Sequence, residues 1–243
     1  MNRVEILLEQ TLSGWQSWSA SKPVVIEPLE GGRTNHSFLV EAGSQQVVVR
    51  INAENGQSLG IDRQREADIL SLLQPVGCVP EIRFMNDQVL ISEFIAGHQW
   101  TGDHLKSTDN FEKITQLLNK IQAIPLPENS QRRSYVDYCQ HYIQQLPESR
   151  QASEKSIIKE LICVAEQVDQ SSWAPVISHH DLVPENLIET EQGVFLLDWE
   201  YAAYGHPAID FVRLYGGDYS HPITGQVLLL QQGVDELWSL VQG

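Results

Sequence analysis

The pattern of hydrophobic and polar positions divides the chain into segments with different periods. From Val4 to Trp18 apolar residues recur every three or four positions, which predicts an amphipathic helix that ends before Pro23. After Pro23 the pattern changes to short β-branched runs separated by turn residues. These runs predict strands of an antiparallel sheet over residues 24–29, 37–40, 47–51, 82–85 and 89–91.

The helical period returns once among these strands and then dominates the rest of the chain. Residues 62–73 carry an apolar face and stop before Pro75, which predicts a single helix in this region. A strand hairpin over residues 187–188 and 194–197 is predicted around Gly193, because glycine permits a tight reversal. Further helices are predicted over about residues 109–124, 135–145, 155–168, 207–215 and 224–241.

These elements predict an α+β fold with two lobes. Residues 1–93 form a small antiparallel β-rich lobe with one helix, and residues 94–243 form a mainly helical lobe, with a hinge near 92–97. With 243 residues, of which 42% are hydrophobic, the chain can bury a sizeable core.

Composition narrows the classes of partner. Acidic residues outnumber basic ones by 32 to 16, so the field of the protein repels nucleic acid and anionic membranes. The same field suits a cationic small substrate, although an acidic surface also serves solubility. The three cysteines lie far apart, which favours neither a disulfide framework nor a zinc site. Charges near the N-terminus and the lack of a long apolar run predict a cytoplasmic location, and no obligate protein partner is evident.

The residues that carry chemistry are concentrated between positions 179 and 198. Asn186 follows Asp181 by five residues, and Asp198 comes after an apolar strand pair. An aspartate can accept the proton of an acceptor hydroxyl, whereas amide and carboxylate oxygens are suitable ligands for Mg²⁺. Each residue alone is typical of a turn, but together they predict phosphoryl transfer that uses ATP and Mg²⁺.

This motif resembles that of the aminoglycoside phosphotransferase and choline kinase superfamily, whose fold is protein-kinase-like. Residues 198–202 (Asp-Trp-Glu-Tyr-Ala) and 205–210 (Gly-His-Pro-Ala-Ile-Asp) are most similar to choline kinases and bacterial thiamine kinases. The resemblance covers nearly the whole chain, although only residues 179–210 are highly specific. It implies an ATP-dependent kinase that phosphorylates the hydroxyl of a small cationic metabolite such as thiamine or choline.

The resemblance also implies a nucleotide site in the N-terminal lobe. No lysine occurs between Lys22 and Lys106, so Arg50, at the end of its predicted strand, is the candidate to grip phosphate oxygens. Glu66 on the following helix is its expected partner. The loop that covers the phosphates and the connector whose backbone meets adenine are expected to supply Gly31, Gly32, Asn35, Glu93, Phe94 and Ile95.

Side chains near Asp198 are candidates for acceptor binding. Aromatic faces mixed with carboxylates suit a quaternary ammonium or thiazolium ion, with ordinary core packing as the alternative. The acceptor candidates are His180, Trp199, Glu200 and Tyr204. His179 is expected to brace the loop by hydrogen bonds, and Asp210, by resemblance, to bind backbone amides. The chain after Asp210 is short for the acidic acceptor-binding helices of aminoglycoside kinases.

Three other functions stay open on the sequence alone. An aminoglycoside or sugar kinase of the same superfamily would use the same loop. A catalytically silent kinase-like module would bind the nucleotide without turnover. A metal-dependent phosphohydrolase would instead use a cluster of histidines and aspartates, namely His179, His180, Asp181, His206 and Asp210.

Overall fold

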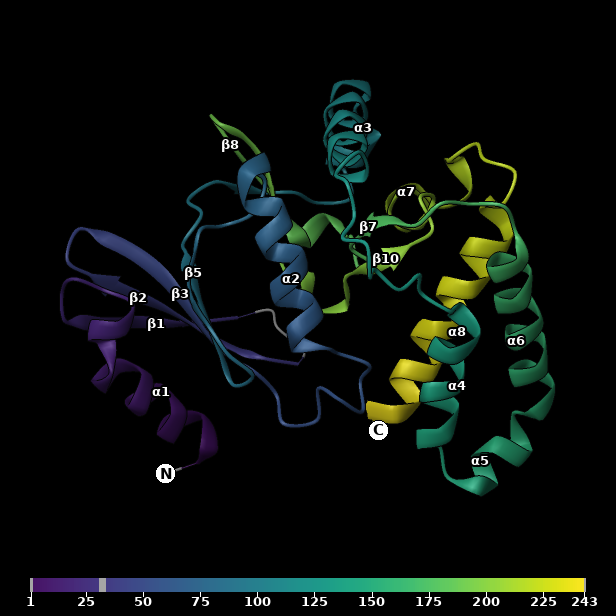
Figure 1. The fold of residues 1–243 in the computed structure, drawn as a ribbon, viewed down its shortest axis with the longest axis horizontal. Helices are drawn as coiled ribbons and strands as arrows, with labels where there is room; N and C mark the ends of the chain where they lie inside the picture. Colours follow the sequence, from purple (N-terminus) through teal and green to yellow (C-terminus); the bar gives the residue numbers. More distant parts are fainter. Residues whose placement is uncertain (1, 31–33, 243) are drawn as a thin grey trace.

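The computed structural model describes residues 2–30 and 34–242 of the chain. It has the two predicted parts, a β-rich lobe at the N-terminal end and a helical lobe at the C-terminal end, and the helix α2 (Arg63–Leu73) lies between them (Figure 1). The α+β class predicted from the sequence is therefore confirmed. Gly31 and Gly32, which were expected to cover the phosphates, lie outside the described residues.

The N-terminal lobe is built on a five-stranded antiparallel sheet with the order β1-β2-β3-β5-β4. Branched side chains such as Val40, Val49 and Ile91 are fully buried on one face, where they pack against Leu7 of the helix α1 (Arg3–Ser13). The strands are β1 (Pro23–Leu29), β2 (His36–Ala42), β3 (Gln45–Ile51), β4 (Ile82–Met85) and β5 (Val89–Glu93).

The first helix is shorter than the sequence predicts. It begins at a capping box formed by Asn2 and Glu5, and it ends at Ser13 because Gly14 follows as the C-cap. Trp15 then starts a separate 3-10 turn, so the apolar period continues to Trp18 although the α-helix does not.

The helix α2 joins the two lobes through its buried face. Ile69 and Leu73 are fully buried, and they pack with Trp100 and Ile114 of the helical lobe. The sequence places this helix among the strands, but its hydrophobic contacts belong to the core that both lobes share. The lobes are therefore joined by packing as well as by the connector.

The helical lobe contains a second core, formed where α4, α6 and α8 pack together at the far end of the molecule (Figure 1). Cys139, Tyr142, Ala165 and Val227 are fully buried there. A short helix over 148–153 was not predicted. The helices are α3 (Thr108–Gln122), α4 (Tyr135–Gln145), α5 (Glu148–Ser153), α6 (Lys155–Gln170), α7 (Ile209–Tyr215) and α8 (Thr224–Gln242).

Two small sheets lie between these layers. The predicted hairpin forms β8 (Leu187–Thr190) and β9 (Gly193–Leu196), and β6 (His98–Gln99) adds to its edge. The strand β7 (Val176–Ser178) pairs with β10 (Ala203–Gly205). The loop that carries Asp181 follows β7, and Asp198 follows β9.

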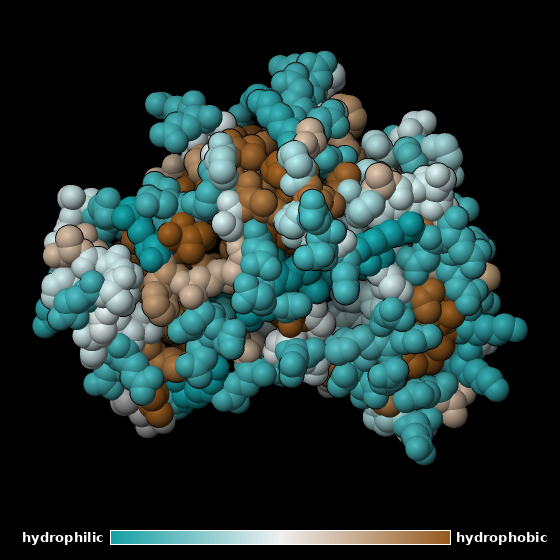
Figure 2. Space-filling model, in the orientation of Figure 1, coloured by the Kyte–Doolittle hydropathy of each residue, from teal (hydrophilic) through white to brown (hydrophobic). Residues whose placement is uncertain are grey.

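The visible face of the molecule is mostly hydrophilic, with scattered apolar patches (Figure 2). This distribution accords with the formal net charge of −16. Among the described residues, none of the helices combines the length and apolar character that a membrane span requires.

Candidate active site

The loop after β7 is held by a buried carboxylate and an imidazole. Asp210 accepts hydrogen bonds from the backbone amides of His179 and His180, at 2.9 and 3.0 Å, and its own side chain is buried. His179 Nε2 lies 2.7 Å from the carbonyl oxygen of Leu197, so it donates to the segment that leads into Asp198. His180 has a φ of 67°, in the left-handed region, which turns the chain sharply before Asp181.

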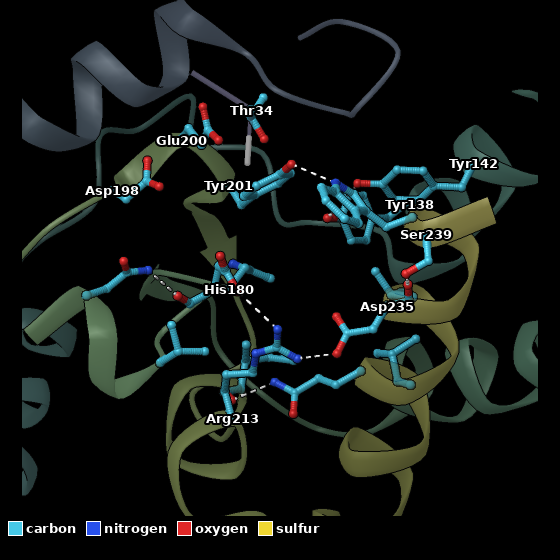
Figure 3. A pocket seen from close by; sticks show the side chains of 18 of the residues that line it. Thr34, Tyr138, Tyr142, His180, Asp198, Glu200, Tyr201, Arg213, Asp235 and Ser239 are labelled. Atoms are coloured by element: carbon cyan, nitrogen blue, oxygen red, sulfur yellow. Dashed lines mark hydrogen bonds and ion pairs between the residues drawn. The ribbon is translucent and has the colours of Figure 1, made fainter. Parts of the chain in front are cut away.

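Asp181, Asn186 and Asp198 come together at one cavity of about 610 Å³. The Asn186 side-chain NH₂ donates to the backbone oxygen of Asp181 at 2.9 Å, which leaves its Oδ1 atom as an available oxygen ligand. Asp198 ends the hairpin with a φ of 61°. Its side chain is 40% exposed, and it lies across the cavity from Arg213 and Asp235 (Figure 3).

Arg50 forms a buried ion pair beside Asp198. Its Nη2 atom donates to both carboxylate oxygens of Glu66, at 2.7 and 2.9 Å, and its Nη1 atom lies 3.4 Å from Asp198 Oδ1. Burial alone would lower the pKa of Arg50, but the carboxylates of Glu66 and Asp198 outweigh it and raise that pKa. The guanidinium therefore stays charged at the cleft.

A second arginine, which the sequence analysis missed, connects the lobes. Arg63 Nη1 lies 2.8 Å from Glu66 and 3.0 Å from Glu200, and the side chain of Asn35 donates to Glu200 at 2.7 Å. Arg63 stands three residues before Glu66 on one helix face, a spacing that the sequence displays. Glu200 is 3% exposed, and its carboxylate holds partners from the N-terminal lobe.

The electrostatics of Asp198 fit a metal ligand. Although 40% of the Asp198 side chain is open to the cavity, enclosure of the carboxylate by the surrounding protein and the nearby Glu200 raise the pKa of Asp198 to about 7, while Arg50 acts in the opposite direction. A divalent cation would relieve this repulsion, and the oxygens of Asp198 and Asn186 are the hard donors that Mg²⁺ prefers. These two residues therefore fit a Mg²⁺ ion whose other ligands come from phosphates.

The His/Asp cluster of a phosphohydrolase is not formed. His206 packs against Trp173, with ring centroids 5.1 Å apart, while Asp210 and His179 hold the loop. Among the described residues, no group of three or more His, Cys, Asp or Glu side chains is arranged to hold a metal ion.

The aromatic wall of the cavity comes from helices that the sequence analysis did not assign to the site. Tyr135, Tyr138 and Tyr142 stand three and four residues apart on α4, a spacing that places them on one helix face. Trp238 of α8 donates from Nε1 to the Tyr201 hydroxyl at 2.9 Å. Figure 3 shows Tyr138, Tyr142 and Tyr201 on the same side of the cavity. Asp235, Trp238 and Ser239 of α8 also line the cavity, so the segment after Asp210 supplies part of its wall.

The acceptor candidates nearest to Asp198 divide into two groups. His180 and Glu200 line the cavity. Trp199 and Tyr204 are not among its lining residues; Trp199 is 2% exposed and packs on His179 with ring centroids 4.6 Å apart. Trp199 is therefore a core-packing residue, which was the alternative to acceptor contact.

His180 is neutral in this environment. Burial lowers its pKa well below the ordinary value of 6.5, and the positive charge of Arg133 acts in the same direction. Its Nε2 atom lies 3.3 Å from the Tyr135 hydroxyl, which links the loop to the aromatic wall.

Helix α4 also contacts the N-terminal lobe. The hydroxyl of Tyr142 donates to the carbonyl oxygen of Leu59 at 2.7 Å, and both residues are buried. One residue of the pocket wall is therefore fixed by the backbone of the other lobe.

An ion-paired arginine, also missed by the sequence analysis, lies at the base of the cavity. Arg213 Nη2 lies 3.0 Å from Asp181 Oδ1, and its Nη1 atom lies 2.5 Å from Asp235 Oδ2 (Figure 3). Asp235 belongs to α8 and Arg213 to α7, so the pair connects the loop of Asp181 to the C-terminal helix.

The connector expected to meet adenine follows the edge of the sheet. Glu93 ends β5 opposite Val47, and the amide of Phe94 donates to the carbonyl of Gln46 at 3.1 Å. Ile95 is buried. None of these three connector residues is among the described residues that line the cavity.

Comparisons with known proteins identify related sequences. A family model described as choline/ethanolamine kinase matches residues 26–226. A LicA homolog of Mycoplasma capricolum is 28% identical over 143 residues, which cover 59% of this chain and 57% of that protein. A probable choline kinase of Arabidopsis thaliana is 23% identical and covers 86% of this chain. The chain spans between 46% and 63% of the length of the curated relatives it matches.

Solved structures share the fold. Choline kinase LicA from Streptococcus pneumoniae superposes with a TM-score of 0.78 at 22% identity, covering 99% of this chain and 91% of that one, and LicA has also been solved in complex with AMP. An aminoglycoside phosphotransferase in a ternary complex with AMP-PNP and hygromycin B superposes at 0.65 with 15% identity, covering 96% and 92%. The protein-kinase-like fold predicted from the sequence is thereby confirmed.

Proposed function

Because this chain belongs to the choline/ethanolamine kinase family, we propose that it transfers the γ-phosphoryl group of ATP to the hydroxyl of a small cationic alcohol such as choline. The observation that carries the proposal is the convergence of Asp181, Asn186 and Asp198 on one cavity whose opposite wall is aromatic. A cavity of about 610 Å³ suits a small acceptor beside the end of a triphosphate.

In the proposed reaction, the acceptor oxygen forms a bond to the γ-phosphorus while the bond from that phosphorus to the β,γ-bridging oxygen breaks. The proton of the acceptor hydroxyl passes to the carboxylate of Asp181, and ADP leaves. Asp181 Oδ1 accepts from Arg213 at 3.0 Å, so the other carboxylate oxygen is the one directed to the acceptor. Asp181 therefore orients the hydroxyl and receives its proton.

The nucleotide end of the site is proposed around Arg50. Its Nη2 atom is bonded to Glu66 and its Nε atom donates to Asn52 at 3.0 Å. The Nη1 atom, which lies 3.4 Å from Asp198 Oδ1, is therefore the nitrogen that would bind a phosphate oxygen. Asn186 and Asp198 would hold Mg²⁺, which when bound neutralises charge on the phosphates. The backbone of residues 93–95 remains the proposed adenine contact, and Gly31 and Gly32 the proposed phosphate cover.

The acceptor end is proposed against the aromatic wall. Tyr138 and Trp238 line the cavity and are only partly buried, so they can present ring surface to it, and aromatic rings attract quaternary and delocalised cations. The negative charge of the chain raises the local concentration of such ions. Choline satisfies these requirements with a quaternary ammonium and thiamine with a thiazolium, so both are candidate acceptors.

A coupled assay of ADP release tests the function. Choline, ethanolamine, thiamine, a sugar and an aminoglycoside are each added to the protein with ATP and Mg²⁺. We expect choline or thiamine to stimulate ADP release many-fold over the rate without acceptor. If ATP binds but no acceptor stimulates its turnover, the protein is a silent nucleotide-binding module and the proposal is wrong.

A further inference from the structure

The acceptor cavity contains a positive charge where a cation is proposed to bind. Among the described residues that line the cavity, Arg213 is the one with a permanent positive charge, and its side chain is 21% exposed. Burial would lower the pKa of Arg213, but the carboxylates of Asp235 and Asp181 raise it overall. The guanidinium is therefore charged at neutral pH and fixed between two carboxylates.

The pairing with Arg213 compensates the charge of Asp235. Asp235 and Trp238 stand three residues apart on α8, so their side chains are neighbours on one helix face. A cation stacked on Trp238 would lie near Asp235, but the Asp235 carboxylate is already bonded to Arg213 at 2.5 Å. Arg213, Asp235 and Asp181 together keep one net negative charge, yet an incoming ammonium group meets an Asp235 carboxylate that is already bound to a guanidinium, which repels it.

The other carboxylates of the cavity are engaged elsewhere or lie at its rim. Glu200 is bonded to Arg63 and Asn35, and Asp198 faces Arg50 on the proposed metal side. Glu185 is exposed on the turn before Asn186. Asp181, on the catalytic loop, shares Arg213 with Asp235. Among the described residues of α4 and α8 that line the cavity, Asp235 is the carboxylate, and Arg213 engages it.

This arrangement distinguishes two kinds of cation. A primary ammonium is a compact, strongly hydrated charge with three N–H donors, and its transfer from water requires oxygen acceptors or a free carboxylate. A quaternary ammonium has no N–H donor, and a delocalised ring cation spreads its charge, so aromatic faces alone can receive either. The charge pair of Arg213 and Asp235 therefore opposes the first kind more than the second.

We propose that Arg213 is a specificity-determining residue, which selects acceptors with a quaternary or delocalised cation over acceptors with a primary ammonium by occupying the carboxylate of Asp235. This inference rests on the proposed function, because it concerns the acceptor of that same site. It assigns choline or thiamine as preferred acceptor class, and ethanolamine as a disfavoured one.

The test compares acceptors across a set of variants. The ratio of kcat/KM for choline to that for ethanolamine is measured in the wild type, Arg213→Met, Asp235→Asn and the double variant. A ratio cancels the loss of turnover that Arg213→Met causes through Asp181. We expect the wild type to favour choline by at least about tenfold, and Arg213→Met to reduce that preference by about tenfold because Asp235 becomes free for the ammonium.

The double variant separates this mechanism from a general change in shape. In Arg213→Met with Asp235→Asn the freed carboxylate is absent, so the preference for choline should return toward the wild-type ratio. Asp235→Asn alone should not increase the use of ethanolamine. Arg213→Gln serves as a second replacement if the methionine variant does not fold.

Binding measurements test the role of Arg213 independently of phosphoryl transfer. Calorimetric dissociation constants for choline and ethanolamine, with a non-hydrolysable ATP analogue present, should show the same changes in ratio without any turnover. A wild type that binds choline selectively but transfers no phosphate would contradict the proposed function and leave the selectivity supported. Three outcomes would each overturn the role of Arg213. In the first, the wild type prefers ethanolamine or binds neither acceptor. In the other two, the choline-to-ethanolamine ratio is unchanged in Arg213→Met and Arg213→Gln, or its shift persists in the double variant.

Discussion

Arg50 donates hydrogen bonds from one nitrogen to both carboxylate oxygens of Glu66, at 2.7 and 2.9 Å, although the two residues are only 7% and 1% exposed. A charge pair at this depth has lost most of its hydration, so each member depends on the other for compensation. The pair is also 3.4 Å from Asp198, which places the same guanidinium at the proposed phosphate site. Stability and the proposed nucleotide binding would therefore depend on one side chain.

Replacing Arg50 with methionine should destabilise the protein. The Glu66 carboxylate would stay buried with Arg63 as its remaining charged partner, and removal of one member of a buried pair lowers the free energy of unfolding by about 3 kcal/mol or more. Urea denaturation measures the change. The matched control is Arg83→Met, whose partner Glu81 is largely exposed, and which should change stability by about 1 kcal/mol or less. Equal effects of the two variants would contradict this account of Arg50.

Asp181→Asn should abolish turnover while it preserves nucleotide binding. The amide has nearly the same shape and can still accept from Arg213, but it is a poor acceptor for the proton of the alcohol. The loss of kcat should be on the order of 10²-fold to 10⁴-fold. Steady-state kinetics and titration with an ATP analogue measure the two properties separately. A variant that keeps the wild-type rate would show that another residue receives the proton.

Nucleotide binding that depends on Mg²⁺ should strengthen as the pH rises through about 7. Burial and Glu200 raise the pKa of Asp198 to about 7, and the protonated carboxyl is a poor metal ligand. The affinity for the ATP analogue with Mg²⁺ is measured across this range, without and with the change Asp198→Asn. The variant should bind more weakly and lose the pH dependence, and a dependence that persists in it would assign the titration to another group.

The same carboxyl should make the metal-free protein less stable as pH rises. The folded state keeps the proton up to about pH 7, whereas the ordinary pKa is 3.8, so the folded state binds more protons between these values. The contribution of Asp198 to the free energy of unfolding therefore falls as the pH rises between these two pKa values. Thermal unfolding of the wild type and Asp198→Asn, compared without metal, should show the difference in slope.

Trp238→Leu should weaken acceptor binding and leave ATP binding unchanged. The indole is the α8 part of the aromatic wall, and loss of one cation–π contact should raise the KM for choline by about tenfold. Trp15→Leu is a suitable control, because Trp15 packs against the N-terminal sheet. Tyr201→Phe removes the hydrogen bond but keeps the ring, so it separates the two contributions. A raised KM for ATP in Trp238→Leu would indicate a general distortion instead.

The large elements of the fold were predictable from local patterns. The strands β1 to β5 agree with the predicted runs because β-branched residues and turn residues alternate clearly there. The strands β6, β7 and β10 were missed, since two or three residues carry no recognisable period. Their partners lie far away in sequence, and only tertiary packing brings them together.

The candidate site was likewise predictable from the sequence only in part. Asp181, Asn186 and Asp198 are close enough in sequence for their spacing to suggest a shared cavity. Tyr138 and Asp235, in contrast, reach that cavity from helices whose patterns are those of ordinary amphipathic helices. The missing information was which helix face meets the loop, and it is set by the packing of α4, α6 and α8.

The hydrogen bond from Tyr142 to the carbonyl oxygen of Leu59 and the ion pair of Arg63 with Glu200 both cross from one lobe to the other, so we expect that the lobes do not fold independently. A chain cut between residues 93 and 94 would leave this hydroxyl without its acceptor, and Glu200 without Arg63. Separately expressed halves should therefore be poorly ordered alone and should complement each other on mixing. The proposed boundary between the lobes would then mark a change of architecture within one cooperative unit.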